Sequence, residues 1–199
     1  MTGETEIAVT AKFPTSEQLE NELKAERYKH SYLHVLRSTV YTLVVVAAVA
    51  ILAATLWLPV LQIIGTSMSP TLEEGNIVVS VKGSKFDAGD VIAFYYNNNV
   101  LVKRVVARSG DWVDIDESGN VYVNGELLDE PYLVEEQKAF GETNIDLPYQ
   151  VPDNRIFVIG DNRDVSIDSR NTSVGCIAEE QIVGQIVFKI WPVSEFGSV

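Results

Sequence analysis

The stretch VLVKRVVARSGD, residues 100–111, decides the fold class of most of this chain. Its first eight residues are apolar apart from one Lys-Arg pair, and the closing SGD is a turn signal. Side chains alternate between the two faces of a strand, so Lys103 shares a face with Leu101 and Val105, while Arg104 points the other way. The stretch is therefore predicted to be a β-strand that carries a lysine on an apolar face and ends in a turn.

Runs of the same kind follow one another from residue 77 onward, separated by turn sequences such as EEGN, DAGD, NNN, ESGN and NG. No ten-residue stretch there has clear helical periodicity, apart from a weak AEEQIV. Residues 129–150 break the pattern and are predicted to form a loop or a small insert. The sequence thus predicts a mainly β domain over residues 62–199. The predicted strands are residues 77–82, 91–96, 100–107, 112–115, 121–123, 155–159 and 182–190.

Ahead of this domain lies an uncharged apolar run, STVYTLVVVAAVAILAATLWLPVL, residues 38–61. As a helix it would extend about 36 Å, which exceeds the roughly 30 Å of a bilayer's hydrocarbon core. A buried core helix is disfavoured because nothing else in the chain could cover it. A cleaved signal peptide is disfavoured because its apolar region would be only about 7–15 residues long. The run is predicted to be a single transmembrane helix.

Charges on either side of the run predict its orientation in the membrane. Four basic residues precede it closely, and no Lys or Arg follows it until Lys82. The positive-inside rule then places residues 1–37 in the cytoplasm and residues 62–199 outside the cell membrane. The four preceding residues are Lys24, Arg27, Lys29 and Arg37.

The composition excludes several classes of partner and chemistry. The net charge of −13 lacks the basic footprint of a nucleic-acid-binding protein. The single cysteine, Cys176, cannot form an intrachain disulfide and is predicted to be a small core residue. Both histidines, His30 and His34, precede the apolar run. No nucleic-acid partner is therefore predicted.

The histidine positions restrict the catalysis that the β domain can perform. A Ser-His-Asp triad, Cys-His chemistry and a Cys/His metal site all need a histidine there. The carboxylates show no metal-ligand spacing, no glycine-rich loop matches a phosphate cradle, and neither G-x-S-x-G nor S-x-x-K occurs. No metal or cofactor is predicted. What remains is a serine activated by a distant lysine, kept neutral by burial.

Two lysines compete for that role on the strand pattern alone. Lys103 lies on the apolar face of its strand, and Lys189 lies between Phe188 and Ile190. An edge-strand lysine that merely blocks aggregation is the commoner meaning of such a pattern, so the pattern leaves the choice open. The remaining lysines of the domain lie among polar or turn residues: Lys82, Lys85 and Lys138.

Four motifs follow the apolar run in a recognisable order: GTSMSPTL (65–72), GDVIAF (89–94), KRVVARSGD (103–111) and GDNRDVSIDSR (160–170). Together they resemble the successive boxes of bacterial type I signal peptidases, in the Gram-positive form, over roughly residues 38–192. The resemblance implies the β-domain that signal peptidases share with LexA-type repressors. It also implies a membrane-bound serine endopeptidase that removes signal peptides from exported preproteins, cutting after small residues at the first and third positions before the cleaved bond.

The resemblance assigns roles to individual residues. Ser67 in SMSPTL matches the nucleophile, Lys103 matches the general base, and Ser166 in DVSID matches the serine that hydrogen-bonds and orients the lysine. The Ser67 backbone N–H is expected to line the oxyanion hole. Some relatives supply a second donor from a serine two residues before the nucleophile; here that residue is Gly65, whose backbone is the remaining candidate donor.

Four charged residues are assigned supporting roles by the same resemblance. Asp168 and Arg170, in DSR, match an ion pair that braces the Ser166 loop. Asp161, in GDNR, is expected to pair with Arg104. Without the motifs, all four would be interpreted as ordinary surface charges.

Two other hypotheses remain at this stage. The chain is alternatively a membrane-anchored β module for binding or assembly without catalysis, although Ser67, Lys103 and Ser166 are all present. A self-cleaving repressor with the same Ser-Lys logic conflicts with the apolar anchor and with the absence of a DNA-binding segment.

Overall fold

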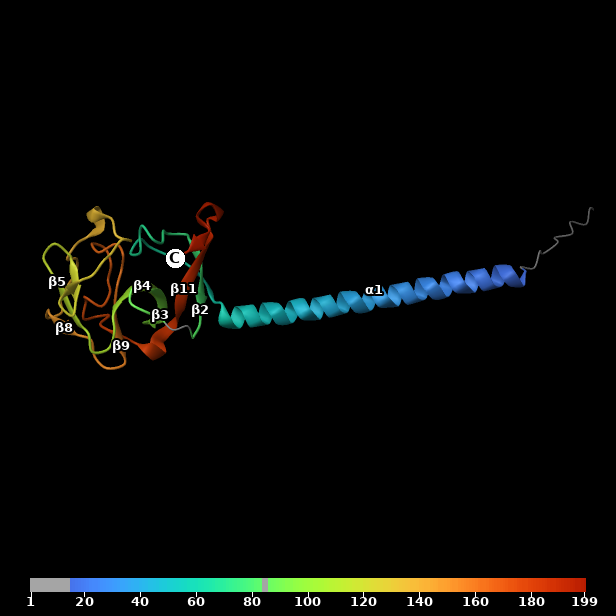
Figure 1. Cartoon of the computed structure of the whole chain (residues 1–199), viewed down its shortest axis with the longest axis horizontal. Coiled ribbons are helices and arrows are strands. Elements are labelled where there is room, and N and C mark those ends of the chain that lie inside the picture. The colour runs from blue at the N-terminus through green and yellow to red at the C-terminus, as the bar shows by residue number, and fades with distance from the viewer. Residues whose placement is uncertain (1–14, 84–85) are drawn as a thin grey trace, which may run out of the picture. The chain divides into compact units, whose positions relative to one another are not determined.

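The computed structural model describes residues 15–83 and 86–199. The chain divides into two compact units, with the boundary between Leu52 and Ala53. One long helix, α1 (Ser16–Trp57), occupies the described part of the first unit and ends in the second (Figure 1). The second unit contains all the strands.

Helix α1 is long and apolar enough to cross a membrane, and it is the one such helix in residues 15–83 and 86–199. Its most apolar window has a mean hydropathy of 2.4. The predicted span reached residue 61, but the helix ends at Trp57. Pro59 cannot continue it, because proline lacks an amide donor and disfavours helical geometry in the residue before it. Of the predicted cytoplasmic segment, residues 1–14 lie outside the described residues.

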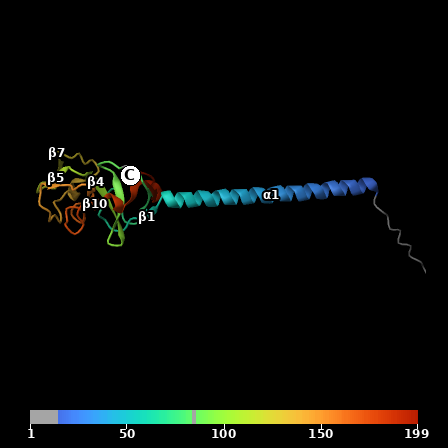
Figure 2. The same cartoon turned by 90° about the horizontal axis from the view of Figure 1, so that it is seen from below.

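The second unit contains two antiparallel sheets. The larger has the order β1-β2-β11-β3-β4-β9-β10, with β12 beside β11, and the smaller has the order β7-β6-β5-β8 (Figures 1 and 2). The larger sheet is made of β1 (Val60–Gln62), β2 (Ile77–Val81), β3 (Val91–Tyr96), β4 (Asn99–Ala107), β9 (Arg155–Ile159), β10 (Ile177–Ala178), β11 (Ile182–Trp191) and β12 (Gly197–Ser198). The smaller is made of β5 (Trp112–Ile115), β6 (Val121–Val123), β7 (Glu126–Leu127) and β8 (Tyr149–Gln150).

The mainly β architecture predicted from the sequence is confirmed. All seven predicted strands are present, and each boundary agrees to within one residue. The strands that the pattern missed are two or three residues long, too short for alternation to be recognised. The weak AEEQIV periodicity corresponds to a single 3₁₀ turn, η2 (Glu179–Gln181), followed by β11. Residues 129–150 hold the turn η1 (Glu135–Gln137) and β8 within an otherwise irregular segment.

The pairing of β4 leaves part of one edge open. Its partner β3 runs along the whole strand, from Val91 opposite Arg104 to Tyr96 opposite Asn99. On the other side, β9 pairs with β4 only from Arg104 onward. Among the described strands, residues 99–103 therefore have no partner on that side, and this edge ends at Lys103.

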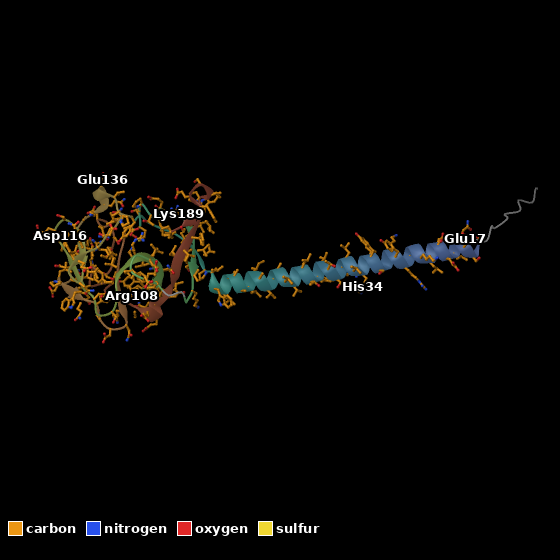
Figure 3. The ribbon with its side chains drawn as sticks, viewed as in Figure 1. Glu17, His34, Arg108, Asp116, Glu136 and Lys189 are labelled. Atoms are coloured by element: carbon orange, nitrogen blue, oxygen red, sulfur yellow. The ribbon has the colours of Figure 1, made fainter. Side chains whose placement is uncertain are left out.

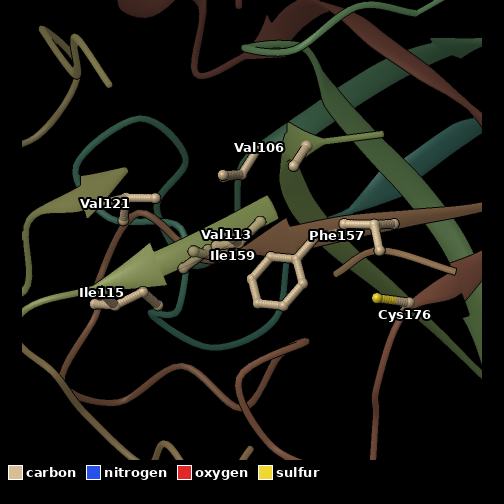
Figure 4. Close-up of a cluster of buried hydrophobic side chains, with 9 residues drawn as sticks. Val106, Val113, Ile115, Val121, Phe157, Ile159 and Cys176 are labelled. Carbon is tan, nitrogen blue, oxygen red and sulfur yellow. The ribbon is translucent and has the colours of Figure 1, made fainter. Parts of the chain in front are cut away.

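Three apolar clusters form the core of the β unit. One lies between the two sheets and includes Phe157, Val113 and Cys176 (Figure 4). A second lies under the chain that leaves β1, where Met68 and Leu72 pack with residues of β2, β3 and β11. The third joins β3, β4, β9 and β10. The second cluster matters most for the site, because it fixes the segment that carries Ser67.

Candidate active site

The segment that carries Ser67 is a tight turn held down on both sides. Met68 is 2% exposed and Leu72 is fully buried, so two apolar side chains fasten the turn to the core. Backbone hydrogen bonds from Ser69 to Thr66 and from Leu72 to Met68, at 3.1 and 2.9 Å, close the turn. Ser67 itself stays half-buried. The small residues of this motif thus present a hydroxyl on a fixed backbone.

Lys103 reaches that hydroxyl from strand β4. Its side chain points into the protein, leaving the residue 3% exposed. Its Nζ donates a hydrogen bond to Ser67 Oγ at 2.6 Å. The alternation of β4 explains the direction, since Lys103 occupies a buried position opposite Ile92 of β3. Two residues 36 positions apart in the sequence are thereby brought into direct contact.

Burial lowers the pKa of Lys103 from 10.5 to about 8, because a charged ammonium is poorly solvated there. The negative charges of Asp168 and Asp161 oppose this shift, and the positive charge of Arg170 adds to it. At pH 7 about a tenth of the molecules then carry a neutral amine, against fewer than one in a thousand for an ordinary lysine. The site is therefore able to hold a lysine that accepts a proton near neutral pH.

The rival lysine serves a different purpose. Lys189 forms an ion pair with Glu195 at 2.9 Å on the surface of the β unit (Figure 3). Lys82 is exposed and Lys138 is half-buried, while Lys85 lies outside the described residues. Lys103 is the lysine that the structure brings to Ser67.

Arg104, the next residue of β4, pairs with Asp161 as the motifs suggested. Arg104 Nε and Nη2 donate to the two carboxylate oxygens at 2.9 and 2.6 Å, and Asp161 is fully buried. Thr71 Oγ1 also donates to this carboxylate, at 2.5 Å. Since Thr71 belongs to the Ser67 turn, Asp161 ties that turn to the strand that carries Lys103.

Asp168 and Arg170 form the expected ion pair, with both residues 1% exposed. Arg170 Nε and Nη2 donate to the carboxylate at 2.9 and 3.0 Å. Asp168 also accepts the Gly160 amide at 2.9 Å, and Arg170 donates to the Ser166 carbonyl at 3.2 Å. The pair therefore braces both ends of the loop that follows β9.

Ser166 differs from the expectation. The resemblance implied a hydrogen bond between its hydroxyl and Lys103, but Ser166 Oγ is buried without a hydrogen-bond partner in the described part of the chain. The hydroxyl nevertheless lies near the backbone of Ser67. A Cβ built on Gly160 would overlap both Ser166 Oγ and the Ser67 carbonyl, which places all three groups together. The orienting role of Ser166 stays a prediction.

Several residues near the pair were not found from the sequence. The Asn162 amide donates to the Ser67 carbonyl at 3.0 Å. Position 160 needs glycine, because a Cβ there would overlap the Ser67 carbonyl. Both belong to the GDNR motif, so a closer inspection of that motif could have found them. Glu130 and Tyr132, which contact Arg163 and Arg104 respectively, lie in the irregular segment and gave no signal.

The backbone before Ser67 leaves two amides available. Within residues 15–83 and 86–199, neither the Ser67 N–H nor the Gly65 N–H donates a hydrogen bond. Gly65 has a φ of 85°, which glycine adopts without strain. Nothing lies within 4 Å of a Cβ built there, so this side of the turn is open.

Cys176 is remote from this chemistry. It is 5% exposed and packs in the cluster between the two sheets (Figure 4). Burial raises the pKa of its thiol to about 11, so the thiolate is scarce at neutral pH. Among the described residues, no group of three His, Cys, Asp or Glu side chains is placed to hold a metal ion.

A serine hydrogen-bonded to a buried lysine, in a domain whose sequence has no histidine, fits the geometry of a serine hydrolase of the Ser-Lys type. The comparisons with known proteins show the family of the chain. The family described as signal peptidase, peptidase S26, matches residues 36–191. Signal peptidase IB of Staphylococcus aureus strain COL is 39% identical over 150 residues, covering 66% of this chain and 77% of the relative.

Two further relatives extend the comparison. Thylakoidal processing peptidase 1 of Arabidopsis thaliana is 36% identical over 147 residues, covering 65% of this chain and 41% of the relative. The crystal structure of a signal peptidase I from Enterococcus faecalis V583 is 28% identical with a TM-score of 0.44, covering 51% of this chain and 97% of that one. The family match over residues 36–191 and the Staphylococcus aureus relative show that the chain belongs to the signal peptidase family, peptidase S26, and is a serine endopeptidase that removes signal peptides.

Proposed function

We propose that Ser67 is the nucleophile of this signal peptidase and that Lys103 is its general base. The observation that carries the proposal is the 2.6 Å hydrogen bond between Lys103 Nζ and Ser67 Oγ. The burial of Lys103 supports it, because the resulting pKa of about 8 makes the neutral amine accessible. A nucleophile and a base within hydrogen-bond reach are the first geometric requirement for this type of catalysis.

The reaction follows from these atoms. Neutral Lys103 accepts the Ser67 hydroxyl proton while Oγ attacks the carbonyl carbon before the cleaved bond. The resulting oxyanion is stabilised by the free amides of Ser67 and Gly65, each worth about 3 kcal/mol where such donors have been removed. Collapse breaks the C–N bond, and the leaving amine takes the proton from the Lys103 ammonium. Water, deprotonated by the neutral lysine, then hydrolyses the ester and restores Ser67.

An extended substrate has a place to bind beside this pair. The edge of β4 at residues 99–103 lacks a neighbouring strand among the described elements, and it ends at Lys103. A peptide added to this edge would form backbone hydrogen bonds and would bring its carbonyl toward Ser67. We propose that the region around a signal-peptide cleavage site binds here as an added strand.

The membrane arrangement is part of the same proposal. Helix α1 is the single-pass anchor, with the four basic residues that precede its apolar part on the cytoplasmic side. The β unit is then extracytoplasmic, in contact with the lipid bilayer at the point where the chain leaves it. A preprotein held in the bilayer by its signal peptide presents its cleavage site at the same surface. The anchor thus confines the enzyme to the plane in which its substrate is held.

The test of the nucleophile is cleavage of a signal-bearing preprotein by the full chain in detergent. Ser67→Ala is expected to abolish cleavage without changing the thermal unfolding temperature. Ser69→Ala is the matched control, because the Ser69 hydroxyl turns away to Glu73 at 2.7 Å, and its activity should stay within a few-fold of the wild type. Cleavage by Ser67→Ala at the wild-type rate would refute the assignment.

The test of orientation is protease accessibility. A protease added to intact spheroplasts is expected to digest the β unit as readily as a known external marker. Complete protection of the β unit while that marker is digested would reverse the proposed topology.

A further inference from the structure

Glu130 and Tyr132 bridge two buried arginines, Arg104 and Arg163. The guanidinium carbon of Arg104 lies 3.8 Å from the centre of the Tyr132 ring. The Tyr132 hydroxyl donates to Glu130 Oε1 at 3.0 Å. The Glu130 carboxylate is in turn ion-paired with Arg163, and both of these side chains are at most 4% exposed. A continuous set of contacts therefore leads from Arg104 to Arg163.

This set of contacts closes on itself. Arg163 Nε donates to the Gly160 carbonyl at 3.0 Å, which fixes the chain where β9 ends. The next residue is Asp161, which accepts the two hydrogen bonds from Arg104. The closed set of contacts thus joins three separate segments: strand β4, residues 130–132, and the loop after β9.

Lys103 and Ser67 are both attached to this closed set of contacts. Lys103 directly precedes Arg104 in β4. Ser67 is held by the loop, since the Asn162 amide donates to its carbonyl at 3.0 Å. The separation of Lys103 Nζ and Ser67 Oγ therefore depends on how firmly these contacts hold β4 against the loop.

The aromatic ring of Tyr132 lies over one face of the Arg104 guanidinium, where hydrogen bonds do not act. The in-plane donors of Arg104 are directed to Gly89, Thr71 and Asp161. The face of the guanidinium remains, and an aromatic ring is the side chain that binds a cation face with useful energy. Burial raises the pKa of the Tyr132 hydroxyl, so the group stays neutral and keeps donating to Glu130.

We propose that Tyr132 is a positioning residue for the peptidase reaction, which acts through Arg104 to keep Lys103 against Ser67. The proposal rests on the proposed roles of Ser67 and Lys103. It also gives a purpose to the first part of the irregular segment at residues 129–150, which none of the four sequence motifs covers.

Kinetics of Tyr132→Leu, measured against pH on the full chain in detergent, test the proposal. We expect kcat to fall on the order of ten-fold or more with little change in KM, because small displacements of reacting groups are costly. The acid limb of kcat/KM should also move upward by about one pH unit, since a Lys103 displaced from its buried position has a higher pKa. The charged groups facing Lys103, which are Asp161, Asp168 and Arg170, are all retained in this variant.

Tyr132→Phe keeps the ring and should restore most of kcat, with the acid limb at its wild-type pH. Tyr122→Leu is the matched control, because Tyr122 is also half-buried and bonds a carboxylate, Asp116, at 3.4 Å in the smaller sheet. It should leave both kcat and the acid limb unchanged. If Tyr132→Leu does not fold, Tyr132→Met fills more of the space and takes its place, with the same outcomes expected.

Three results would overturn the positioning role. The first is a folded Tyr132→Leu or Tyr132→Met enzyme with wild-type kcat and acid limb. The second is a loss of kcat with an unmoved acid limb that Tyr122→Leu reproduces, which would indicate general destabilisation. The third is a Tyr132→Phe enzyme as impaired as Tyr132→Leu. An inactive Ser67→Ala alongside any of these would leave the proposed nucleophile standing, so the two failures are distinguishable.

Discussion

Strand β4, and the chain that runs from β9 into the loop after it, each contribute to two buried regions of opposite character. At one end, Lys103, Arg104 and Asp161 belong to a polar cluster, with every one of these residues at most 7% exposed. At the other end, Val106 and Phe157 belong to the apolar cluster between the sheets (Figure 4). The same two segments therefore change from an apolar interior to a charged one within a few residues.

The two regions contribute to stability in different ways. Apolar burial stabilises by about 25 cal/mol per Å² of surface removed from water. A buried ion pair at best offsets its own desolvation, and apolar replacements are often equally stable. The apolar cluster therefore accounts for folding, whereas the polar cluster needs a further reason, and the position of Ser67 and Lys103 supplies one. Perturbing the polar cluster should mainly change catalysis, except where a buried charge loses its partner and stability falls as well. Perturbing the apolar cluster should mainly change stability.

The largest effect is expected at Lys103. Lys103→Arg keeps the positive charge but cannot release a proton near neutral pH, so cleavage should be undetectable. In the wild type, kcat/KM should fall about ten-fold per pH unit below the Lys103 pKa of about 8, because protonation removes the base. Above that pH the neutral amine dominates, and the rate should level off. An active arginine variant, or a flat profile between pH 5 and pH 8, would exclude Lys103 from the mechanism.

The second effect concerns the Asp168–Arg170 ion pair. Asp168→Asn keeps the shape of the side chain but leaves the Arg170 guanidinium buried without its counter-charge. Breaking a buried pair in this way typically costs about 3–5 kcal/mol, so the unfolding temperature should fall substantially and activity with it. The double variant Asp168→Asn/Arg170→Met removes both charges and should recover part of the stability. Equal unfolding temperatures for Asp168→Asn and the wild type would show that the pair contributes nothing.

A smaller and more selective effect is expected at Ser166. Its hydroxyl is buried without a hydrogen-bond partner among the described residues, and an unsatisfied buried hydroxyl does not stabilise a fold. Ser166→Ala should therefore unfold at the same temperature as the wild type or slightly higher. If the hydroxyl turns to Lys103 once substrate binds, kcat should still fall by about 10²-fold, the low end of what general acid–base catalysis contributes. Unchanged kcat would remove Ser166 from the mechanism.

The strands and the reacting pair were predictable from the sequence to different degrees. Alternating apolar residues located seven strands, because burial on one face of a sheet imposes that pattern directly. The same pattern left Lys103 and Lys189 as alternatives, and the motif resemblance, rather than the strand pattern, favoured Lys103. The structure supplies the distinguishing contacts: Lys103 reaches Ser67, while Lys189 pairs with Glu195.

The contacts of residues 129–150 could not be predicted. Glu130 meets Arg163 and Tyr132 meets Arg104 across about 30 residues of sequence. Such contacts depend on how an irregular segment folds back over the sheet, and an irregular segment has no periodicity from which side-chain direction can be inferred. The strands β7, β8 and β10, each two residues long, were missed for a related reason. The existence of β8 and β10 depends on partners more distant in the sequence, β5 and β9, whereas β7 forms a tight hairpin with β6 and is too short to show alternation.

The smallest effect on catalysis is expected at Cys176, in the apolar cluster. Its thiol packs in a different apolar cluster from the one that holds the Ser67 turn, its pKa is raised to about 11 by burial, and the β unit has no histidine to activate it. Cys176→Ala removes one buried sulfur, which should lower the free energy of unfolding by roughly 1 kcal/mol and leave kcat/KM within a few-fold of the wild type at every pH. Cys176→Ser is a useful companion, because it keeps the size but buries a more polar group, and should be less stable than Cys176→Ala. Both variants should retain the acid limb set by Lys103, since neither alters the charges around it. A folded Cys176→Ala protein that cannot cleave a preprotein would contradict the division between the two regions and would point to a thiol in the reaction.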